Sequence, residues 1–197
     1  SDLQEADIFA NQQKYVRPLM PYEIFMANIE AGNDEQLIIK SLVESYGLII
    51  TSKKIPGGIC AVATLEYIHR RYGFHVLNRT LRLCIGTWEG EVNSLSANML
   101  KGISHLVATF GDAMKDDLFK DKVGAFSAKE IGRTAKERKA GSFGYAEAMI
   151  IAYNKRMKAT LSWAKLYTNK ADAVEVVDHD DAEEDTDDTA LVLGEDV

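Results

Sequence analysis

The sequence has few of the residues that mark disulfide-rich, fibrous or membrane-spanning proteins. It holds two cysteines, Cys60 and Cys84, in apolar stretches, which favours small buried side chains over a disulfide framework. Three prolines and 14 glycines are too few for a linker or a collagen-like chain. No apolar run approaches the ~20 residues that cross a membrane, and the acidic first residues are unlike a secretory signal. We therefore expect a cytoplasmic protein without membrane contact.

Lys and Arg are absent from the segment 172–197. That segment holds 12 of the 30 Asp and Glu residues and none of the 23 Lys and Arg residues. The formal net charge of −7 thus divides into −12 on the segment and +5 on residues 1–171. Because the segment also lacks aromatic residues and helical periodicity, we predict a disordered acidic tail over 171–197. Residues 1–170 are predicted to form one helical domain.

The apolar pattern of residues 1–170 predicts a series of helices. Helical spacing and glycine stops indicate helices over 2–13, 22–31, 34–46, 61–72, 74–85, 95–110 and 145–157, the last weakly extended to 167. Capping boxes are predicted at Asn33 with Gln36 and at Ser127 with Glu130, the latter opening an outer helix. Residues 48–51 are the one strand-like run. The predicted fold is an all-α bundle of about seven to nine helices with at most one short strand.

One cluster of basic residues precedes and follows Gly73. His75, Arg79 and Arg82 recur at positions i, i+4 and i+7, opposite an apolar helix face. No acidic residue occurs between Glu66 and Glu89. Such stripes suit phosphate contacts, which hold a protein on nucleic acid without reading sequence. A solvated helix face explains the pattern equally well. The predicted contacts are Arg70, Arg71, His75, Arg79 and Arg82.

A second basic cluster begins at residue 129. Residues 129–170 hold ten basic and three acidic residues, a net charge of +7. The predicted phosphate contacts are Lys129, Arg133, Lys136, Arg138 and Lys139. Aromatic residues interleave with them, and such rings can stack on unpaired bases, although core packing is the commoner role of any single ring. These rings are Phe143, Tyr145, Tyr153, Trp163 and Tyr167.

Two further patterns are weaker. Lys53 and Lys54, with Gly57 and Gly58, precede a helix, where free amides can hold a phosphate. The run lacks the Gly-Lys-Ser/Thr ending of a nucleotide-binding loop, so an ordinary turn is favoured. Residues 66–69 read Glu-x-x-His, but a di-iron bundle needs a second such pair, which the sequence lacks. We predict no cofactor, no metal and no catalytic constellation.

Two longer motifs lie in the first 70 residues. One is Ile8-Phe9 with Val16-Arg-Pro-Leu-Met-Pro-Tyr-Glu-Ile-Phe25 and a stop at Ala31-Gly32; the other is Ile55-Pro-Gly-Gly-Ile-Cys-Ala-Val-Ala-Thr-Leu-Glu-Tyr-Ile68. In this order they resemble the C-terminal helical half of ParB/sulfiredoxin-fold proteins of bacteria, phages and mobile elements, over about residues 3–155. The resemblance places any nucleotide or nuclease chemistry in an N-terminal mixed domain with a Gly-Gln-His-Arg-type segment. This sequence contains no such segment, so no catalytic residues are implied.

The sequence thus predicts a non-enzymatic, nucleic-acid-associated helical module, with DNA as the first choice and RNA not excluded. Its acidic tail is expected to compete with nucleic acid for the basic patches. A protein-interaction or oligomerisation bundle is the alternative, in which the basic faces meet an acidic partner or another copy of the chain. A third interpretation is one part of an enzyme whose active site lies in another domain.

Overall fold

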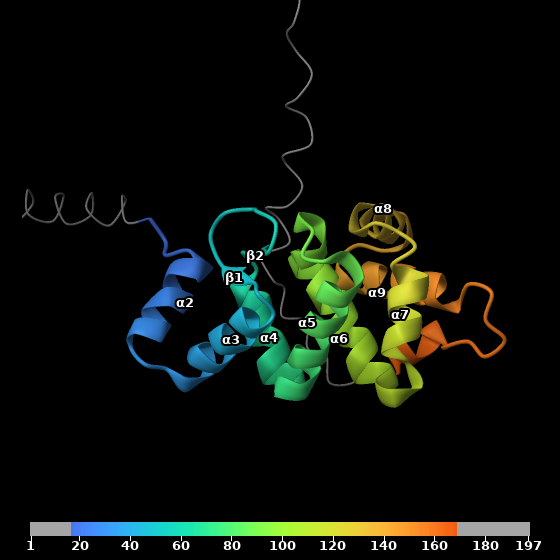
Figure 1. Ribbon diagram of the computed structural model, residues 1–197, viewed down its shortest axis with the longest axis horizontal. Coiled ribbons are helices and arrows are strands. Elements are labelled where there is room, and N and C mark those ends of the chain that lie inside the picture. Colours follow the sequence, from blue (N-terminus) through green and yellow to red (C-terminus); the bar gives the residue numbers. More distant parts are fainter. Residues whose placement is uncertain (1–16, 169–197) are drawn as a thin grey trace, which may run out of the picture.

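The computed structural model describes residues 17–168, whose regular secondary structure is almost entirely helical. Figure 1 shows the chain progressing along the long axis, from α2 and α3 at one end, through α4 to α6, to α7, α8 and α9. The described α-helices are α2 (Pro21–Glu30), α3 (Asp34–Ser45), α4 (Val62–Tyr72), α5 (Phe74–Trp88), α6 (Ala97–Phe110), α7 (Asp116–Val123), α8 (Ala128–Arg138) and α9 (Ser142–Asn154). Short 3₁₀ turns are η1 (Val92–Leu95), η2 (Gly111–Ala113) and η3 (Trp163–Tyr167). The predicted all-α class is confirmed; the predicted helix over 2–13 and the tail lie outside the described residues.

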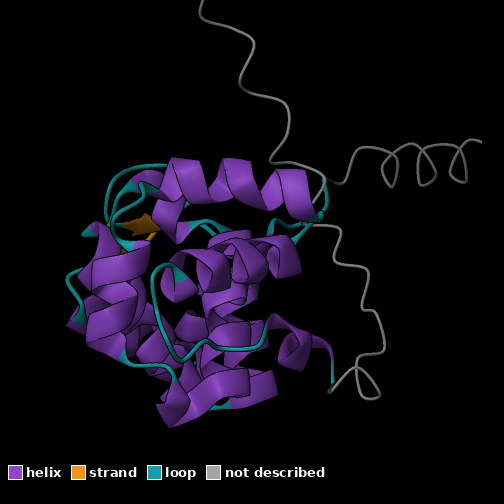
Figure 2. Cartoon of the chain, turned by 90° about the vertical axis from the view of Figure 1, so that its right-hand side faces the viewer, coloured by secondary structure: helices purple, strands orange, loops and turns teal. Residues whose placement is uncertain are grey.

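Two very short strands form a parallel pair among the helices (Figure 2). β1 (Ile49–Ile50) lies within the predicted strand, and β2 (Gly58–Ile59) begins at Gly58, the last residue of the predicted turn. Ile49 pairs with Gly58, and Ile50 pairs with Ile59. The Ile49 N–H donates to the Gly57 carbonyl at 2.9 Å, and the Thr51 N–H donates to the Ile59 carbonyl at 3.0 Å. The pair closes the loop that leads into α4.

Helix α6 is the centre of the core. It packs against α4, α5 and α9, and ten of its fourteen residues are buried. Its apolar stripe is evident from the sequence, but the tertiary structure also encloses polar positions, including Lys101, Ser104 and His105. The Cys84 thiol of α5 is buried as predicted and donates to the Ser94 carbonyl at 2.9 Å. Burial raises its pKa to about 12.

The two predicted capping boxes have different outcomes. Ser127 Oγ accepts from the Glu130 N–H at 3.2 Å, and Glu130 Oε2 accepts from the Ser127 N–H at 2.8 Å, so this box is confirmed. The box at Asn33 is wrong, because the Asn33 side chain donates to Asn28 and Gln36 donates to Glu66 Oε1 at 2.7 Å. The Gln36 side chain thus contacts Glu66 on α4 and does not reach back to the start of α3.

Two elements near the end of the domain differ from the predicted pattern. Helix α7 is not evident from the sequence, because its eight residues are too few to show helical periodicity. Helix α9 begins three residues before the predicted start and carries Gly144 in its first turn. A side chain at Gly144 would overlap the Lys139 carbonyl oxygen and lie 2.7 Å from that of Ala135. This close approach of α8 and α9 positions the residues described next.

Candidate nucleic-acid interface

The basic stripe of α5 is tied to α7. Arg79 Nε donates to Asp116 Oδ1 at 2.9 Å, and Arg82 Nη2 donates to Asp116 Oδ2 at 2.8 Å. Arg79 also donates to the carbonyls of Gly111, at 2.8 Å, and Met114, at 2.5 Å. With 16% of its side chain exposed, Arg79 fastens α5 to the start of α7. Because protein acceptors enclose its guanidinium, a structural role is favoured over the predicted phosphate contact.

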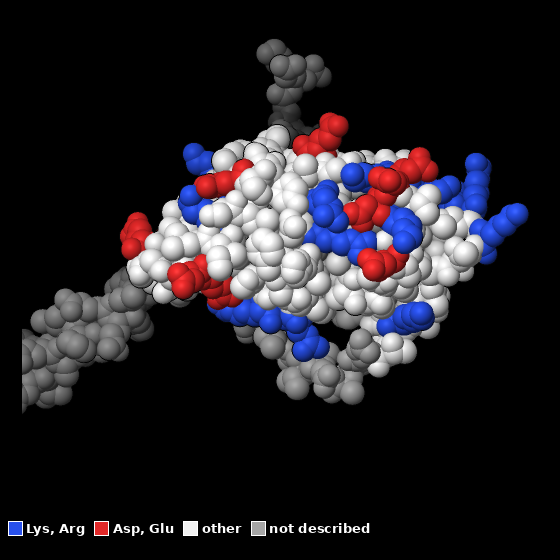
Figure 3. All heavy atoms as spheres, turned by 60° about the horizontal axis from the view of Figure 1, so that its bottom comes forward, with Lys and Arg blue, Asp and Glu red and all other residues white. Residues whose placement is uncertain are grey.

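Asp116 offsets much of the positive charge of this stripe. Burial alone would raise the pKa of Asp116, but hydrogen bonds from Arg82 and Arg79 outweigh it and hold the pKa below its ordinary value. Figure 3 shows Lys and Arg interspersed with Asp and Glu on the face of the molecule that it presents. His75 and Arg82 remain exposed. The stripe is therefore a mixed-charge surface.

Arg70 has a similar structural contact. Its Nε and Nη2 donate to the two carboxylate oxygens of Glu35 at 2.9 and 2.7 Å, joining α4 to α3. His69 Nδ1 lies 3.2 Å from Glu35 Oε1, and Glu66 accepts from Gln36. The Arg70 hydrogen bond is the main cause of a lowered Glu35 pKa; burial opposes it, and His69 adds to it. Glu66 and His69 are thus held by α3, and no metal-binding cluster occurs in residues 17–168.

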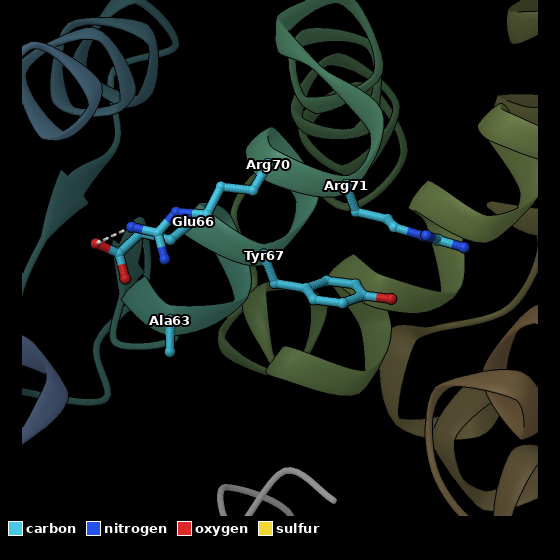
Figure 4. A pocket seen from close by; sticks show the side chains of 5 residues that line it. All are labelled: Ala63, Glu66, Tyr67, Arg70 and Arg71. Atoms are coloured by element: carbon cyan, nitrogen blue, oxygen red, sulfur yellow. Dashed lines mark ion pairs between the residues drawn. The ribbon is translucent and has the colours of Figure 1, made fainter. Parts of the chain in front are cut away.

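A shallow hollow of about 410 Å³ lies on the exposed side of α4. Figure 4 shows the Arg70 guanidinium turned toward Glu66, whereas Tyr67 and Arg71 extend the other way. Arg71 is exposed, and the Lys101 ammonium lies 5.3 Å from the centre of the Tyr67 ring. The hollow is open, and Glu66 offsets part of the positive charge of the arginines that line it. Of the two arginines that line it, Arg70 is paired with Glu35, and Arg71 is the other predicted contact.

The turn before α4 does not present the amides of its glycines. The Gly57 N–H donates to the Gly90 carbonyl at 2.8 Å, and the Gly58 N–H donates to the Ile55 carbonyl at 3.0 Å. The ordinary-turn interpretation fits these contacts, and the turn supplies no phosphate-binding amide from either glycine. Lys53 and Lys54 are exposed beside it.

Helix α8 exposes the second predicted basic cluster together with two acidic residues, Glu130 and Glu137. It buries Ala128, Ile131, Gly132 and Ala135 against the domain. Its opposite face exposes Lys129, Arg133 and Lys136, with Arg138 and Lys139 at its end. Within residues 17–168, neither Lys129 nor Arg133 forms an ion pair. Glu130, on the same helix, is engaged with Ser127 at the cap. The solvent exposure of these cations fits the face that the helical spacing indicated, and their role as phosphate contacts stays a prediction.

An aromatic stack continues this face beyond the end of α8. The rings of Phe143 and Tyr167 stack with centres 5.4 Å apart, and Lys139 Nζ lies 4.7 Å from the centre of the Tyr167 ring. The Tyr167 hydroxyl donates to Glu147, and Arg138 Nε donates to the other carboxylate oxygen of Glu147 at 3.0 Å. Burial and the Glu147 contact raise the pKa of Tyr167. Arg138 is thus partly engaged, whereas Lys139 lies over the stack.

The stack extends inward to His105 of α6. His105 and Phe143 stack with centres 4.4 Å apart. Tyr72 Oη and Ser142 Oγ each lie 3.0 Å from a ring nitrogen of His105. Burial, then the charges of Lys101 and Arg71, lower the pKa of His105 to about 4. The Ser142–His105 pair has the spacing of a nucleophile and base, but so weak a base suits a neutral structural contact better than proton abstraction at pH 7.

The five interleaved aromatic residues divide into core and surface. Tyr153 is 3% exposed, and its hydroxyl accepts from the Lys115 N–H at 3.1 Å. Phe143, Tyr145 and Tyr167 are partly buried. Trp163 is 51% exposed and meets Tyr167 edge to face, with ring centres 6.2 Å apart. The sequence indicated no difference among these rings, because residues 155–168 lack a periodic apolar pattern.

The fold and this surface define the class: an all-α domain with an exposed basic helix that ends beside an aromatic stack. None of the described helices has the length and apolarity needed to cross a membrane. The chain belongs to a family of unknown function (DUF6551), whose model matches residues 1–162. No curated protein and no solved structure matches it.

Proposed function

We propose that the chain is a non-enzymatic nucleic-acid-binding module, with DNA as the first candidate ligand. The observation that carries the proposal is the exposed face of α8 formed by Lys129, Arg133 and Lys136, with Lys139 beyond it. We name these four residues the α8 basic face. Because contacts to phosphates supply the sequence-independent part of nucleic-acid affinity, such a face suits backbone binding. His75, Arg71 and Arg82 are further exposed basic residues of the predicted set, on α4 and α5.

The proposal predicts a steep dependence of affinity on salt. Binding that neutralises Z phosphates on duplex DNA has a slope of log K against log salt of about −0.9Z. Four cations on the α8 basic face therefore predict a slope between about −3 and −4. Between about 50 and 200 mM salt, the affinity should fall by roughly 100-fold. Fluorescence anisotropy of a labelled duplex across a salt series measures this slope.

A paired variant separates the α8 basic face from total charge. Lys129→Gln with Arg133→Gln should weaken DNA binding at all salt concentrations and reduce the slope by about 2. Lys53→Gln with Lys54→Gln removes the same charge from the turn before α4 and should leave the slope within about half a unit. Absence of binding at low salt, a salt-insensitive affinity, or equal effects of the two double variants would refute binding through α8.

The same DNA-binding measurement tests the role of the acidic segment 172–197. Its 12 carboxylates make it a tethered polyanion that can compete for the α8 basic face. Removing residues 172–197 should therefore tighten DNA binding, most strongly at low salt. Unchanged affinity after truncation would contradict competition by this segment.

The wider context of the module is also a proposal. The motifs that resemble ParB/sulfiredoxin-fold proteins support a helical module that serves a larger bacterial, phage or mobile-element protein. The thiols of Cys60 and Cys84 are both free, which fits a reducing cytoplasm. A Gly-Gln-His-Arg-type segment upstream in the same reading frame would support this context directly.

A second candidate function is self-association through α2, α3 and β1. These neighbouring elements, with residues 19 and 20, leave large apolar side chains exposed: Leu19, Met20, Ile24, Leu37, Ile38 and Ile49. Exposed apolar side chains from adjoining elements are typical of contact surfaces between proteins. Light scattering that gives a mass above the 21.9 kDa monomer, unchanged by added DNA, would favour this function. A monomer at high concentration would exclude it.

A further inference from the structure

Trp163 is an exposed ring on an ordered support. It opens η3, and 51% of its surface is accessible. Leu166, three residues later in the same turn, is buried at 6% and anchors η3 to the domain. The indole meets the Tyr167 ring edge to face, at an interplanar angle of 83°. A large apolar face is therefore accessible to a flat ligand.

The support behind the indole is fixed by several contacts. Tyr167 stacks on Phe143, which in turn stacks on the buried His105. The Tyr167 hydroxyl is bound to Glu147, a side chain that is itself held by Arg138. Because Tyr167 is already ordered, a ligand that stacks on Trp163 need not order the support behind it. The ring cluster therefore acts as a prearranged platform.

The charges beside the platform favour an anionic ligand. Lys139 Nζ lies 4.7 Å from the Tyr167 ring centre, and Lys165 is exposed on η3 itself. The carboxylate in direct contact with the stack, Glu147, is 7% exposed and paired with Arg138, so it presents little negative charge outward. A ligand with a flat apolar face and adjacent negative charge fits this arrangement. A nucleotide has both features.

We propose that Trp163 is a stacking platform for an unpaired nucleobase, so that the module prefers single-stranded over duplex nucleic acid. The inference rests on the proposed function, since the α8 basic face leads to the same stack through Lys139. In a duplex the base faces are covered by their neighbours, whereas in a single strand they can stack on an aromatic side chain. Phosphates of that strand would contact Lys139 and the α8 basic face.

The test compares a single-stranded oligothymidylate of roughly 15 nucleotides with a duplex of equal length on the full chain. Trp163→Ala should weaken single-strand binding by about 5- to 150-fold, the effect of losing one stacked base. Its duplex affinity should stay within about twofold. Trp163→Phe should restore part of the single-strand affinity. Phe74→Ala, which removes the exposed aromatic ring of α5, is the matched control and should change neither affinity.

Fluorescence provides a direct readout of stacking. Trp88 is 9% exposed and its indole N–H donates to the Phe126 carbonyl at 2.9 Å, so the accessible indole of the chain's two tryptophans is Trp163. The oligothymidylate should quench tryptophan emission strongly, and the duplex should quench it weakly. An unchanged thermal unfolding midpoint will show that Trp163→Ala is folded, as expected for an exposed side chain.

The outcomes separate the two proposals. If neither oligonucleotide binds at low salt, the proposed nucleic-acid function itself fails. If both bind with equal affinity and Trp163→Ala changes neither, backbone binding survives and the stacking platform is refuted. If polyglutamate quenches Trp163 as strongly as the oligothymidylate, the surface recognises negative charge alone, and the platform is again refuted.

Discussion

Replacing His105 should change how stability depends on pH. The folded chain holds this imidazole neutral, with a pKa of about 4, because it is 7% exposed and faces the charges of Lys101 and Arg71. In the unfolded chain its pKa returns to about 6.5. Between these values the unfolded state binds a proton that the folded state does not. Stability should therefore be greatest above pH 6.5 and fall as the pH falls toward 4.

The size of the effect follows from the two pKa values. Each pKa unit corresponds to about 1.4 kcal/mol. Integrating over the titration, His105 should remove about 2 kcal/mol of unfolding free energy between pH 7 and pH 5. By pH 4 the loss should approach about 3 kcal/mol. For a domain of this size, whose total stability is about 5–15 kcal/mol, the difference is readily measured.

The measurement is urea unfolding at several pH values from 7 to 5, a range that avoids the main titration of the carboxylates. His105→Gln cannot be protonated, so its stability should vary with pH by about 2 kcal/mol less than that of the wild type. Its stability at pH 7 will itself be lower, because the stack on Phe143 is lost, and the comparison therefore uses only the change with pH. His75→Gln is the matched control, since His75 is exposed on α5, and it should follow the wild type.

One result would refute the reasoning about His105. If wild type and His105→Gln lose equal stability from pH 7 to pH 5, the buried imidazole does not exclude its proton. The contacts with Tyr72 and Ser142 would then have to accommodate a charged ring. If the stability of His75→Gln falls between pH 7 and pH 5 by as little as that of His105→Gln, the pH dependence does not come from the burial of His105.

Two further predictions concern stability. Asp116→Asn should cost about 2 kcal/mol at pH 7, because the enclosed guanidinium of Arg79 loses its carboxylate, whereas Asp117→Asn on the exposed side of α7 should cost under about 0.5 kcal/mol. The pKa of Asp116 is lower in the folded chain than its ordinary value of 3.8, so the ion pair stabilises the fold above pH 3.8 and this stabilisation is lost as the pH falls below that value. The difference in unfolding free energy between wild type and Asp116→Asn should therefore narrow at low pH, and a difference that persists would contradict the ion pair. Gly144→Ala should cost about 3 kcal/mol, since its Cβ meets two backbone carbonyls, and Gly86→Ala, which meets the flexible end of Lys120, should change stability by less than about 1 kcal/mol. Equal thermal unfolding midpoints for the two glycine variants would contradict the close approach of α8 and α9.

Much of the helical fold follows from local patterns in the sequence. Apolar spacing and glycine stops placed α2 to α6 within a few residues of their positions, and the Ser127–Glu130 box marked the start of α8. Local signals failed where a distant partner decides the contact. Gln36 turns to Glu66, 30 residues away, in place of capping α3. Helix α7 is stabilised by packing against α5 and α9, which no short window can show.

The candidate site shows the same division. Spacing alone grouped the cations on α8 and those on α5 equally well, since both follow i, i+4 and i+7. Their environments differ because Asp116, which lies 37 residues after Arg79, packs against α5. Similarly, the sequence could not distinguish exposed Trp163 from buried Tyr153. Exposure of a ring depends on which helices cover it.

By itself the sequence determined the helical class, the separation of an acidic segment from a basic body, and the positions of the cations along each helix. These properties are local, since they depend on residue type and on neighbours within a few positions. Only the tertiary structure decided that Arg79 is enclosed, that Lys129 and Arg133 face solvent, and that Trp163 rests on Tyr167. The ion pair that encloses Arg79 joins residues 37 positions apart, and the exposure of a cation or a ring depends on which elements pack over it, so both are settled only when the helices pack.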